Sequence, residues 1–156
     1  MVEDVRGEDQ FVRLVALNDT INWQPASTGT GRFGNWLENL VDWNLSRSRY
    51  WGTPLPIWRT EDREEEICIG SIAELRAEAD KAVAAGFMDK TLPEAIDLHK
   101  PYVDEVILVS PSGKPMRREA DLIDVWFESG AMPYAQWHYP FENLETFKNS
   151  FPADFI

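Results

Sequence analysis

The seven tryptophans of this 156-residue chain form two groups, and this spacing constrains the fold more than any other sequence feature. The groups are Trp23, Trp36, Trp43, Trp51 and Trp58, and then Trp126 and Trp137. The stretch between them contains no tryptophan and opens with the acidic run 61–66. Large aromatic side chains supply much of the buried area of a core. The pattern therefore favours a Trp-rich body interrupted by a more polar insertion, with a solvated loop before an ordinary helix as the alternative.

Charge follows the same division. The chain carries 27 acidic and 15 basic residues, which gives a net charge of −12. Most of the acidic excess lies in residues 61–156, whereas residues 31–60 are net basic because four arginines fall there. A chain this acidic is not expected to be a small, self-sufficient nucleic-acid-binding protein, which is normally basic. Its length allows one domain or parts of two.

Neither a membrane-spanning nor a secreted chain is expected. No apolar run approaches the roughly 20 residues that a bilayer span needs. The N-terminus is acidic and lacks the apolar segment of a signal peptide, so we expect a cytoplasmic protein. The single cysteine, Cys68, can form neither an internal disulfide nor a cysteine-rich zinc site. Because Ile67 and Ile69 flank it, the pattern predicts a buried, inert thiol.

Two local signals predict elements of the insertion. Ser71 and Glu74 form a capping box that starts a helix, and Gly86 is placed to end it in a left-handed conformation. Residues 103–109 are rich in β-branched side chains and lead into the turn sequence 110–114, which predicts a hairpin.

Other elements are predicted from apolar periodicity and caps. Helices are expected over 11–18 and 36–43, with the glycine-rich residues 29–34 as a flexible turn before the second. Residues 122–127 predict a short, largely buried strand, and Asn143 can cap a last helix. The predicted fold class is mixed α/β.

No catalytic constellation is complete in the sequence. His99 and His138 have no partner at metal-ligand or triad spacing, so both are interpreted as packed or surface imidazoles. The carboxylates Asp121 and Asp124 are interpreted as surface charges or helix caps rather than as a general acid and base.

Residues 42–56 carry a first candidate binding segment. If this segment is extended, Arg47, Arg49 and Trp51 share one face. Two guanidinium groups beside an aromatic plane suit phosphate contact and base stacking. The alternative is a pair of surface arginines beside a core tryptophan.

Residues 124–136 carry a second candidate. A strand that ends in Ser129–Gly130 and leads into a helix would lie where open α/β sheets bind ligands. Trp126 could form one wall of an apolar pocket there, although tryptophan is also common in cores.

Both segments resemble class I isoleucyl-tRNA synthetases. Residues 42–58 read DWNLSRSRYWGTPLPIW, similar to the block that resumes the catalytic core after the editing insertion in isoleucyl, valyl and leucyl enzymes. Residues 121–143 read DLIDVWFESGAMPYAQWHYPFEN, similar to the long-form isoleucyl enzymes. The resemblance covers residues 15–156, while the first eight or so residues fit poorly. Valyl-tRNA synthetase is the alternative within the class, and the MPYAQ residues disfavour it.

The resemblance implies a partial Rossmann-type catalytic domain interrupted by a small α+β insertion. It divides the chain into a core segment at 1–59, a connective insertion at 60–121 and a second core segment at 122–156. Several bacterial relatives hold this insertion with cysteine-based zinc knuckles. Since Cys68 is the only cysteine, we expect packing without zinc.

The resemblance also implies a reaction and its substrates. Family members activate isoleucine with ATP and Mg²⁺ and transfer it to tRNA(Ile). Trp126 matches the tryptophan that lines the isoleucine pocket, with Ser129 and Gly130 as its neighbours. Arg47, Arg49 and Trp51 match a block near ATP or the tRNA acceptor end. Neither a HIGH-type nor a KMSKS-type motif occurs in the sequence, so no catalytic residue is assigned and the isolated segment is expected to be inactive.

A noncatalytic Trp-rich module that stacks sugars or peptides is the alternative from a different class. It requires several tryptophans exposed on one face, whereas the synthetase interpretation predicts that most are buried.

Overall fold

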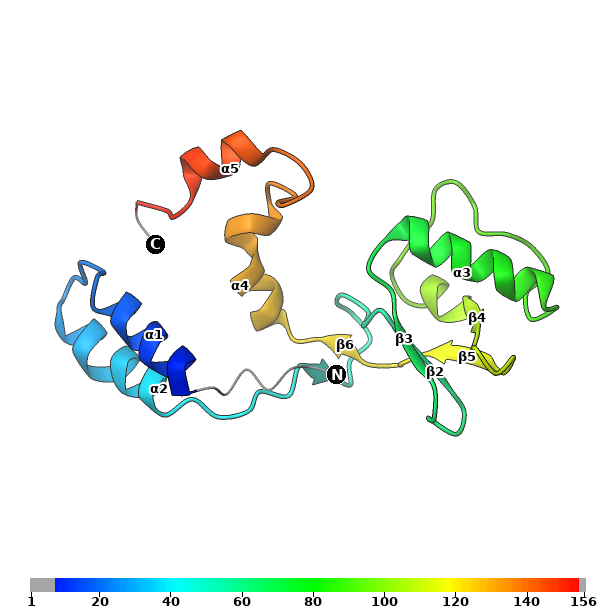
Figure 1. The fold of residues 1–156 in the computed structure, drawn as a ribbon, viewed down its shortest axis with the longest axis horizontal. Coiled ribbons are helices and arrows are strands. Elements are labelled where there is room, and N and C mark those ends of the chain that lie inside the picture. The colour runs from blue at the N-terminus through cyan, green and yellow to red at the C-terminus, as the bar shows by residue number, and fades with distance from the viewer. Residues whose placement is uncertain (1–7, 155–156) are drawn as a thin grey trace. The chain divides into compact units, whose positions relative to one another are not determined.

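A computed structural model describes residues 8–154 of the chain, which divides into two compact units at Asn44 and Leu45. The fold is mixed α/β, as predicted, and its elements are shown in Figure 1. Both sheets within the described residues are antiparallel.

The first unit is helical. It contains α1 (Glu8–Asn18), a π-helical turn (Thr28–Phe33) and α2 (Gly34–Glu38), and α1 packs against α2. The predicted helix ending at Asn18 is confirmed. The buried side chain of Asn18 donates to the carbonyl of Gly29 at 3.1 Å and accepts from Nε1 of Trp23 at 3.0 Å. These bonds tie the end of α1 to the turn that precedes α2.

Glycines allow close packing in this unit rather than flexibility. A Cβ on Gly29 would lie 2.1 Å from the Trp23 ring, and one on Gly34 would lie 2.5 Å from the Gly29 carbonyl oxygen. The predicted flexible turn is therefore wrong, because residues 28–33 form a helical turn. The predicted helix over 36–43 is wrong in its bounds, since α2 ends at Glu38.

The second unit contains a four-stranded antiparallel sheet in the order β3-β2-β5-β4. The strands are β2 (Ile57–Thr60), β3 (Glu66–Cys68), β4 (Ile107–Val109) and β5 (Pro115–Arg118). The predicted hairpin is confirmed, with Val109 opposite Pro115 across the turn. Its first strand is shorter than expected, because residues 102–105 form a 3-10 helix (Tyr102–Glu105).

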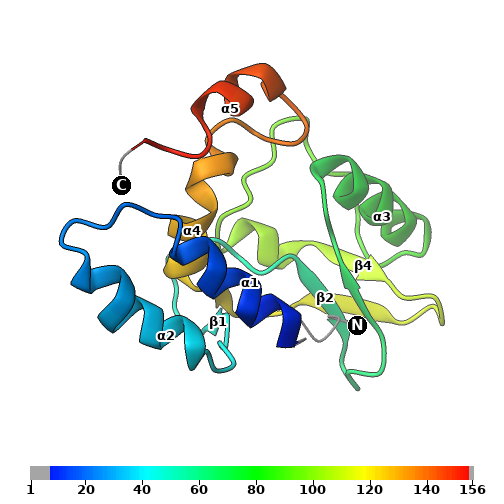
Figure 2. The ribbon, with the colours of Figure 1, turned by 60° about the vertical axis from the view of Figure 1, so that its left-hand side comes forward.

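Helix α3 (Ile72–Ala84) covers one face of this sheet (Figure 2). The Ser71 hydroxyl accepts from the Glu74 N–H at 3.1 Å, as the capping box predicts. The Glu74 carboxylate reaches back one residue further than expected, to the N–H of Gly70 at 2.7 Å. Gly86 follows the helix with a φ of +80°, a conformation that favours glycine.

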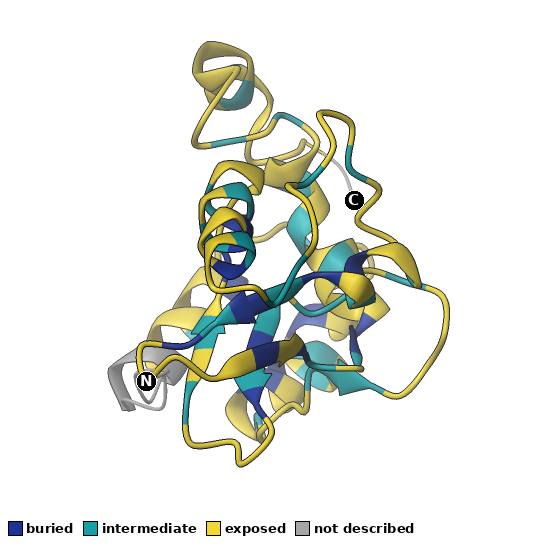
Figure 3. Cartoon of the chain, turned by 90° about the vertical axis from the view of Figure 1, so that its right-hand side faces the viewer, coloured by how far each residue is buried: buried dark blue, intermediate teal, exposed yellow. Residues whose placement is uncertain are grey.

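The core lies between α3 and the sheet (Figure 3). Trp58 of β2 is 1% exposed, and its Nε1 donates to the Val106 carbonyl at 2.8 Å. The buried residues around it are Ile69, Leu75, Ala79, Val103, Val106, Leu108 and Met116. The buried tryptophan therefore brings the sheet, α3 and the segment before β4 together.

A buried arginine closes the end of the sheet. The side chain of Arg118 is 1% exposed, and its Nε donates to Asp104 at 2.6 Å. The same guanidinium donates to the carbonyls of Leu55 at 3.2 Å and Asp121 at 3.1 Å. These bonds hold the segment before β2, at Leu55, beside the segment after β5, at Asp121.

Burial of two residue types differs from expectation. Cys68 is exposed, because alternation along the edge strand β3 directs Ile67, and not Cys68, toward the core. Of the seven tryptophans, all within the described residues, only Trp58 is buried. At least half of the surface is exposed for four of them: Trp36, Trp43, Trp51 and Trp126. The expectation that most tryptophans are buried is therefore wrong for this chain.

Side chains join the turn between β2 and β3 to the turn between β4 and β5. Lys114 donates to Asp62 at 2.6 Å. The Glu65 carboxylate accepts from the hydroxyls of Ser110 and Ser112. The hydrogen bond from Lys114, followed by that from Thr60, holds the pKa of Asp62 well below its usual value of 3.8. The same bond raises the pKa of Lys114 above 10.5.

We expect Trp58→Ala to lower the free energy of unfolding by about 3–5 kcal/mol, because it removes a buried side chain and leaves a cavity. Trp126→Ala is the matched control, since its indole is 72% exposed. The control should change the free energy by about 0.5 kcal/mol or less. Urea unfolding of the chain measures both, and equal effects would contradict the assignment of the core.

Lys114→Met should destabilise the chain most between the ordinary pKa values of the two groups. The Asp62 contribution is present above pH 3.8 and is lost as pH falls through its lowered pKa. The Lys114 contribution is present below pH 10.5 and is lost as pH rises through its raised pKa.

Urea unfolding of wild type and variant across pH measures this difference, which should also shrink at high salt. Lys90→Met is the control, because the structure gives Lys90 no ion pair with residues 8–154. A Lys114→Met effect that is the same at pH 2 and pH 7 would contradict the pairing.

Candidate substrate-binding site

Strand β6 (Leu122–Ile123) lies between two stretches of residues 46–54. On one side β1 (Ser46–Arg47) pairs antiparallel with β6 and places Arg47 opposite Leu122. On the other side Pro54 forms a β-bridge with the same leucine. Leu122 is consequently buried between them. The predicted strand at 122–127 is confirmed only for its first two residues.

The turn between these stretches depends on Gly52. Its φ is +145°, a value that side-chain-bearing residues rarely adopt. A Cβ at this position would also lie 3.2 Å from Cδ1 of Leu122. The chain can therefore fold tightly over β6 only with glycine here.

Helix α4 (Val125–Ala135) begins where the strand was expected to continue. Oδ1 of Asp124 accepts from the N–H of Trp126 at 3.1 Å, which makes Asp124 the N-cap, one of the two roles predicted for it. Its carboxylate also pairs with Arg47. The prediction of a strand through Phe127 is wrong, because the cap satisfies a free N–H of the first turn and favours a helix.

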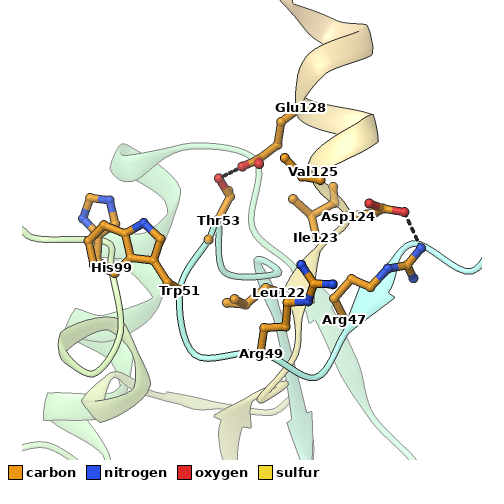
Figure 4. A pocket seen from close by; sticks show the side chains of 11 residues that line it. Arg47, Arg49, Trp51, Thr53, His99, Leu122, Ile123, Asp124, Val125 and Glu128 are labelled. Carbon is orange, nitrogen blue, oxygen red and sulfur yellow. Dashed lines mark hydrogen bonds and ion pairs between the residues drawn. The ribbon is translucent and has the colours of Figure 1, made fainter.

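A pocket of about 420 Å³ opens beside this junction (Figure 4). Its lining comes from the segment around Gly52, from the loop that carries His99, and from β6 and the first turn of α4. The lining residues are Arg47, Arg49, Trp51, Gly52, Thr53, His99, Leu122, Ile123, Asp124, Val125 and Glu128. The structure thus brings together all three residues of the first predicted candidate.

An aromatic stack forms one wall of the pocket. The rings of Trp51 and His99 are 5.4 Å apart at an angle of 7° (Figure 4). The His99 N–H donates to the Asp97 carboxylate at 2.9 Å, and Nδ1 of the ring lies 2.8 Å from the same oxygen. These contacts hold the pKa of Asp97 below its ordinary value. Trp51 is 74% exposed, so the stack leaves aromatic surface open to a ligand.

The polar groups of the pocket nearly balance in charge. Arg47 pairs with Asp124, and Glu128 accepts a hydrogen bond from the Thr53 hydroxyl. The structure gives Arg49 no ion pair with residues 8–154, and its side chain lies at the pocket beside Leu122 (Figure 4). Arg49 is therefore the cation best placed to contact an anionic group.

The second predicted candidate lies outside this pocket. Trp126, Ser129 and Gly130 are exposed on α4 and are not among the lining residues. Their spacing of three and four residues places them on one face of the helix. A Cβ on Gly130 would meet nothing within 4 Å. Pro133 has no N–H to donate to the Ser129 carbonyl one turn earlier.

Sequence reasoning assigned no binding role to Thr53, His99 or Glu128, which are among the lining residues of the pocket. His99 was expected to be a packed or surface imidazole, and it is an exposed ring that stacks on Trp51. No local signal marks it, because the stack joins residues far apart in the sequence. Glu128 and Thr53 are 75 residues apart, so their bond also depends on the fold.

Two other kinds of feature are absent from residues 8–154. This part of the chain has no group of three or more His, Cys, Asp or Glu residues placed to hold a metal ion. None of its helices is long and apolar enough to cross a membrane.

The contribution of the aromatic stack can be measured with a double-mutant cycle. We expect Trp51→Ala and His99→Ala to show a coupling of about 0.5 kcal/mol in unfolding free energy, the low end for aromatic pairs because both rings are exposed. Urea unfolding of the four chains provides the values. His138 packs on Phe141 instead, so Trp51→Ala and His138→Ala should be additive. Additivity of the Trp51 and His99 substitutions would contradict the stack.

Several known proteins similar to this chain share one name, isoleucine–tRNA ligase. The chain is 74% identical over 144 residues to an isoleucine–tRNA ligase of Cytophaga hutchinsonii, a match that covers 92% of the chain and 13% of that protein. It is 63% identical over 161 residues to the ligase of Bacteroides fragilis (92% and 14%) and 53% identical over 145 residues to that of Clostridium acetobutylicum (92% and 13%). The chain thus spans about one-seventh of the length of these relatives.

A family model described as "tRNA synthetases class I (I, L, M and V)" matches residues 6–156, nearly the whole chain. That range includes β1, β6, α4 and the pocket between them. The chain belongs to the class I tRNA synthetases of the isoleucine, leucine, methionine and valine group.

Proposed function

We propose that this chain is a segment of an isoleucine–tRNA ligase, which activates isoleucine with ATP and transfers it to tRNA(Ile). The observation that carries the proposal is the 74% identity to a protein of that name over 92% of the chain. The relatives named here are all isoleucine ligases, which favours this specificity over the valyl alternative. The segment contains neither a HIGH-type nor a KMSKS-type motif, and we propose that it is inactive in isolation.

Residues 60–121 form a connective insertion between catalytic-core segments 1–59 and 122–156 in this proposal. The pairing of β1 with β6 supports it, because the two proposed core segments meet there. The Rossmann-type character of the core is inferred from the family, since the sheets of residues 8–154 are antiparallel. Apolar side chains of residues 60–121 pack on Trp58 of β2, just before the proposed insertion, which supports an insertion that folds without zinc.

The exposed face of α4 contacts the isoleucine side chain in this proposal. Trp126 provides apolar area, and Gly130 leaves open space one turn away on the same face. An apolar wall discriminates by size, and one methylene is worth only about 1–3 kcal/mol. Trp126, Ser129 and Gly130 are therefore proposed as substrate-binding residues.

The pocket lined by Arg49, Trp51 and His99 faces a nucleotide, either ATP or the acceptor end of tRNA(Ile). Arg49 can contact a phosphate, and the aromatic stack can take a base. The carboxylates of Asp124 and Glu128 already accept from protein donors. The proposal therefore assigns neither carboxylate to Mg²⁺.

Exposed tryptophans are compatible with a synthetase in this proposal. The alternative of a Trp-rich binding module requires several of them on one face, but Trp51 lies at the pocket and Trp126 on a face of α4 outside it. The relatives are about seven times longer than the chain. We infer that other parts of such an enzyme cover these side chains.

Trp126→Ala in the full-length synthetase should raise the KM for isoleucine or lower the rate of adenylate formation, because it removes an apolar wall. One to two powers of ten in kcat/KM correspond to the loss of about 1–3 kcal/mol. Isoleucine-dependent pyrophosphate exchange measures the change.

The control is Tyr102→Ala, which removes an exposed ring from the insertion. Its exchange activity should match that of the wild type. Unchanged isoleucine-dependent exchange in Trp126→Ala would show that Trp126 does not contact isoleucine.

A further inference from the structure

We propose that the pairs Arg47–Asp124 and Thr53–Glu128 form a two-point clamp that positions the isoleucine-binding face of α4. This inference rests on the proposed function and adds four positioning residues to it. None of the four contacts isoleucine in that proposal, and all four line the pocket proposed for the nucleotide. Each pair joins residues 75 or 77 positions apart in the sequence, and both pairs link the segment around Gly52 to the first turns of α4.

The first point of the clamp is at the start of the helix. Asp124 is 3% exposed, and its two carboxylate oxygens bind different partners. Oδ1 accepts from the N–H of Trp126 at 3.1 Å, while Oδ2 pairs with Arg47. The Asp124 N–H also donates to the Leu45 carbonyl at 2.8 Å. Arg47 thus acts on the backbone of Trp126 through one shared carboxylate.

The second point lies one turn further along. Glu128 accepts from the hydroxyl of Thr53, which belongs to the stretch on the other side of β6 (Figure 4). Four residues of helix separate the two carboxylates, a rise of about 6 Å. One contact would leave the helix free to tilt about it. Two contacts from opposite sides of β6 restrain both the tilt and the rotation of the helix.

Rotation matters because the substrate face is opposite the clamp. Glu128 and Trp126 differ by two residues, which is about 200° around the helix axis. Any rotation that follows loss of a clamp contact turns the face of Trp126, Ser129 and Gly130 by the same angle. A binding wall misplaced by about 1 Å can cost a hundredfold in rate. The clamp therefore affects isoleucine recognition without touching the substrate.

The test uses Asp124→Asn and Thr53→Val in the full-length synthetase. Asparagine keeps an acceptor for the Trp126 N–H but removes the charge that holds Arg47, and valine removes only the Thr53 hydroxyl. Each variant should raise the isoleucine KM about five- to tenfold and lower the isoleucine-to-valine ratio of kcat/KM, since the wall is displaced.

Two further variants separate positioning from stability. Thr53→Ser keeps the hydroxyl and should restore the isoleucine KM toward the wild-type value. Ser71→Ala removes the corresponding N-cap from α3 and should leave isoleucine recognition unchanged, although it costs comparable stability. A lower discrimination ratio in Thr53→Val but not in Ser71→Ala supports the clamp even if Asp124→Asn does not fold.

Trp126→Ala in the same assay distinguishes the two levels of the proposal. If it raises the isoleucine KM while Thr53→Val and Asp124→Asn do not, the clamp is overturned and the proposed isoleucine-binding face of α4 stands. If Trp126→Ala has no effect, the isoleucine-binding face and the clamp that rests on it are both overturned.

Discussion

The pairing of β1 with β6 is the interaction on which the candidate site depends. It joins residues that are distant in sequence, as the 77-residue separation of Arg47 and Asp124 illustrates. Leu122 is buried between β1 and Pro54, and Gly52 allows the turn that connects these two flanks. The pocket, the stack of Trp51 on His99 and the start of α4 all adjoin this short pairing. Without this pairing, the two segments that resemble the synthetases, residues 42–58 and 121–143, would have no fixed position relative to each other.

The same pairing explains how a large insertion can be accommodated. The Leu55 N–H donates to the Asp121 carbonyl at 3.3 Å. The chain therefore leads into the proposed insertion and returns from it at adjacent points. Arg118 bonds to the carbonyls of both residues and reinforces this closure. The entropic cost of closing a loop grows slowly with its length. Residues 60–121, whose apolar side chains pack on Trp58 of β2, can therefore fold between Leu55 and Asp121 without separating β1 from β6.

Elements defined by nearby residues could be predicted from the sequence. The capping box at Ser71, the left-handed Gly86 and the 110–114 turn depend on contacts within a few positions, and all three are confirmed. Longer-range consequences could not be predicted. The pattern at 122–127 is apolar enough for a strand, but Asp124 acts as a helix cap and the last three residues are helical.

The candidate site divides in the same way. Arg47, Arg49 and Trp51 were predicted to share one face of an extended segment, and they line one pocket although the chain turns after β1. His99 could not be predicted, since only the fold brings its loop to Trp51. Cys68 was misjudged because apolar neighbours do not reveal which face of an edge strand meets the core.

Helix α4, held by the segment that wraps β6, is proposed to present Trp126 to isoleucine. A crystal structure of the full-length synthetase with a nonhydrolysable isoleucyl-adenylate analogue tests this arrangement most directly. The aliphatic side chain should pack on the indole of Trp126 while Asp124 still joins Arg47 to the Trp126 N–H. An isoleucine side chain bound away from α4 would contradict it.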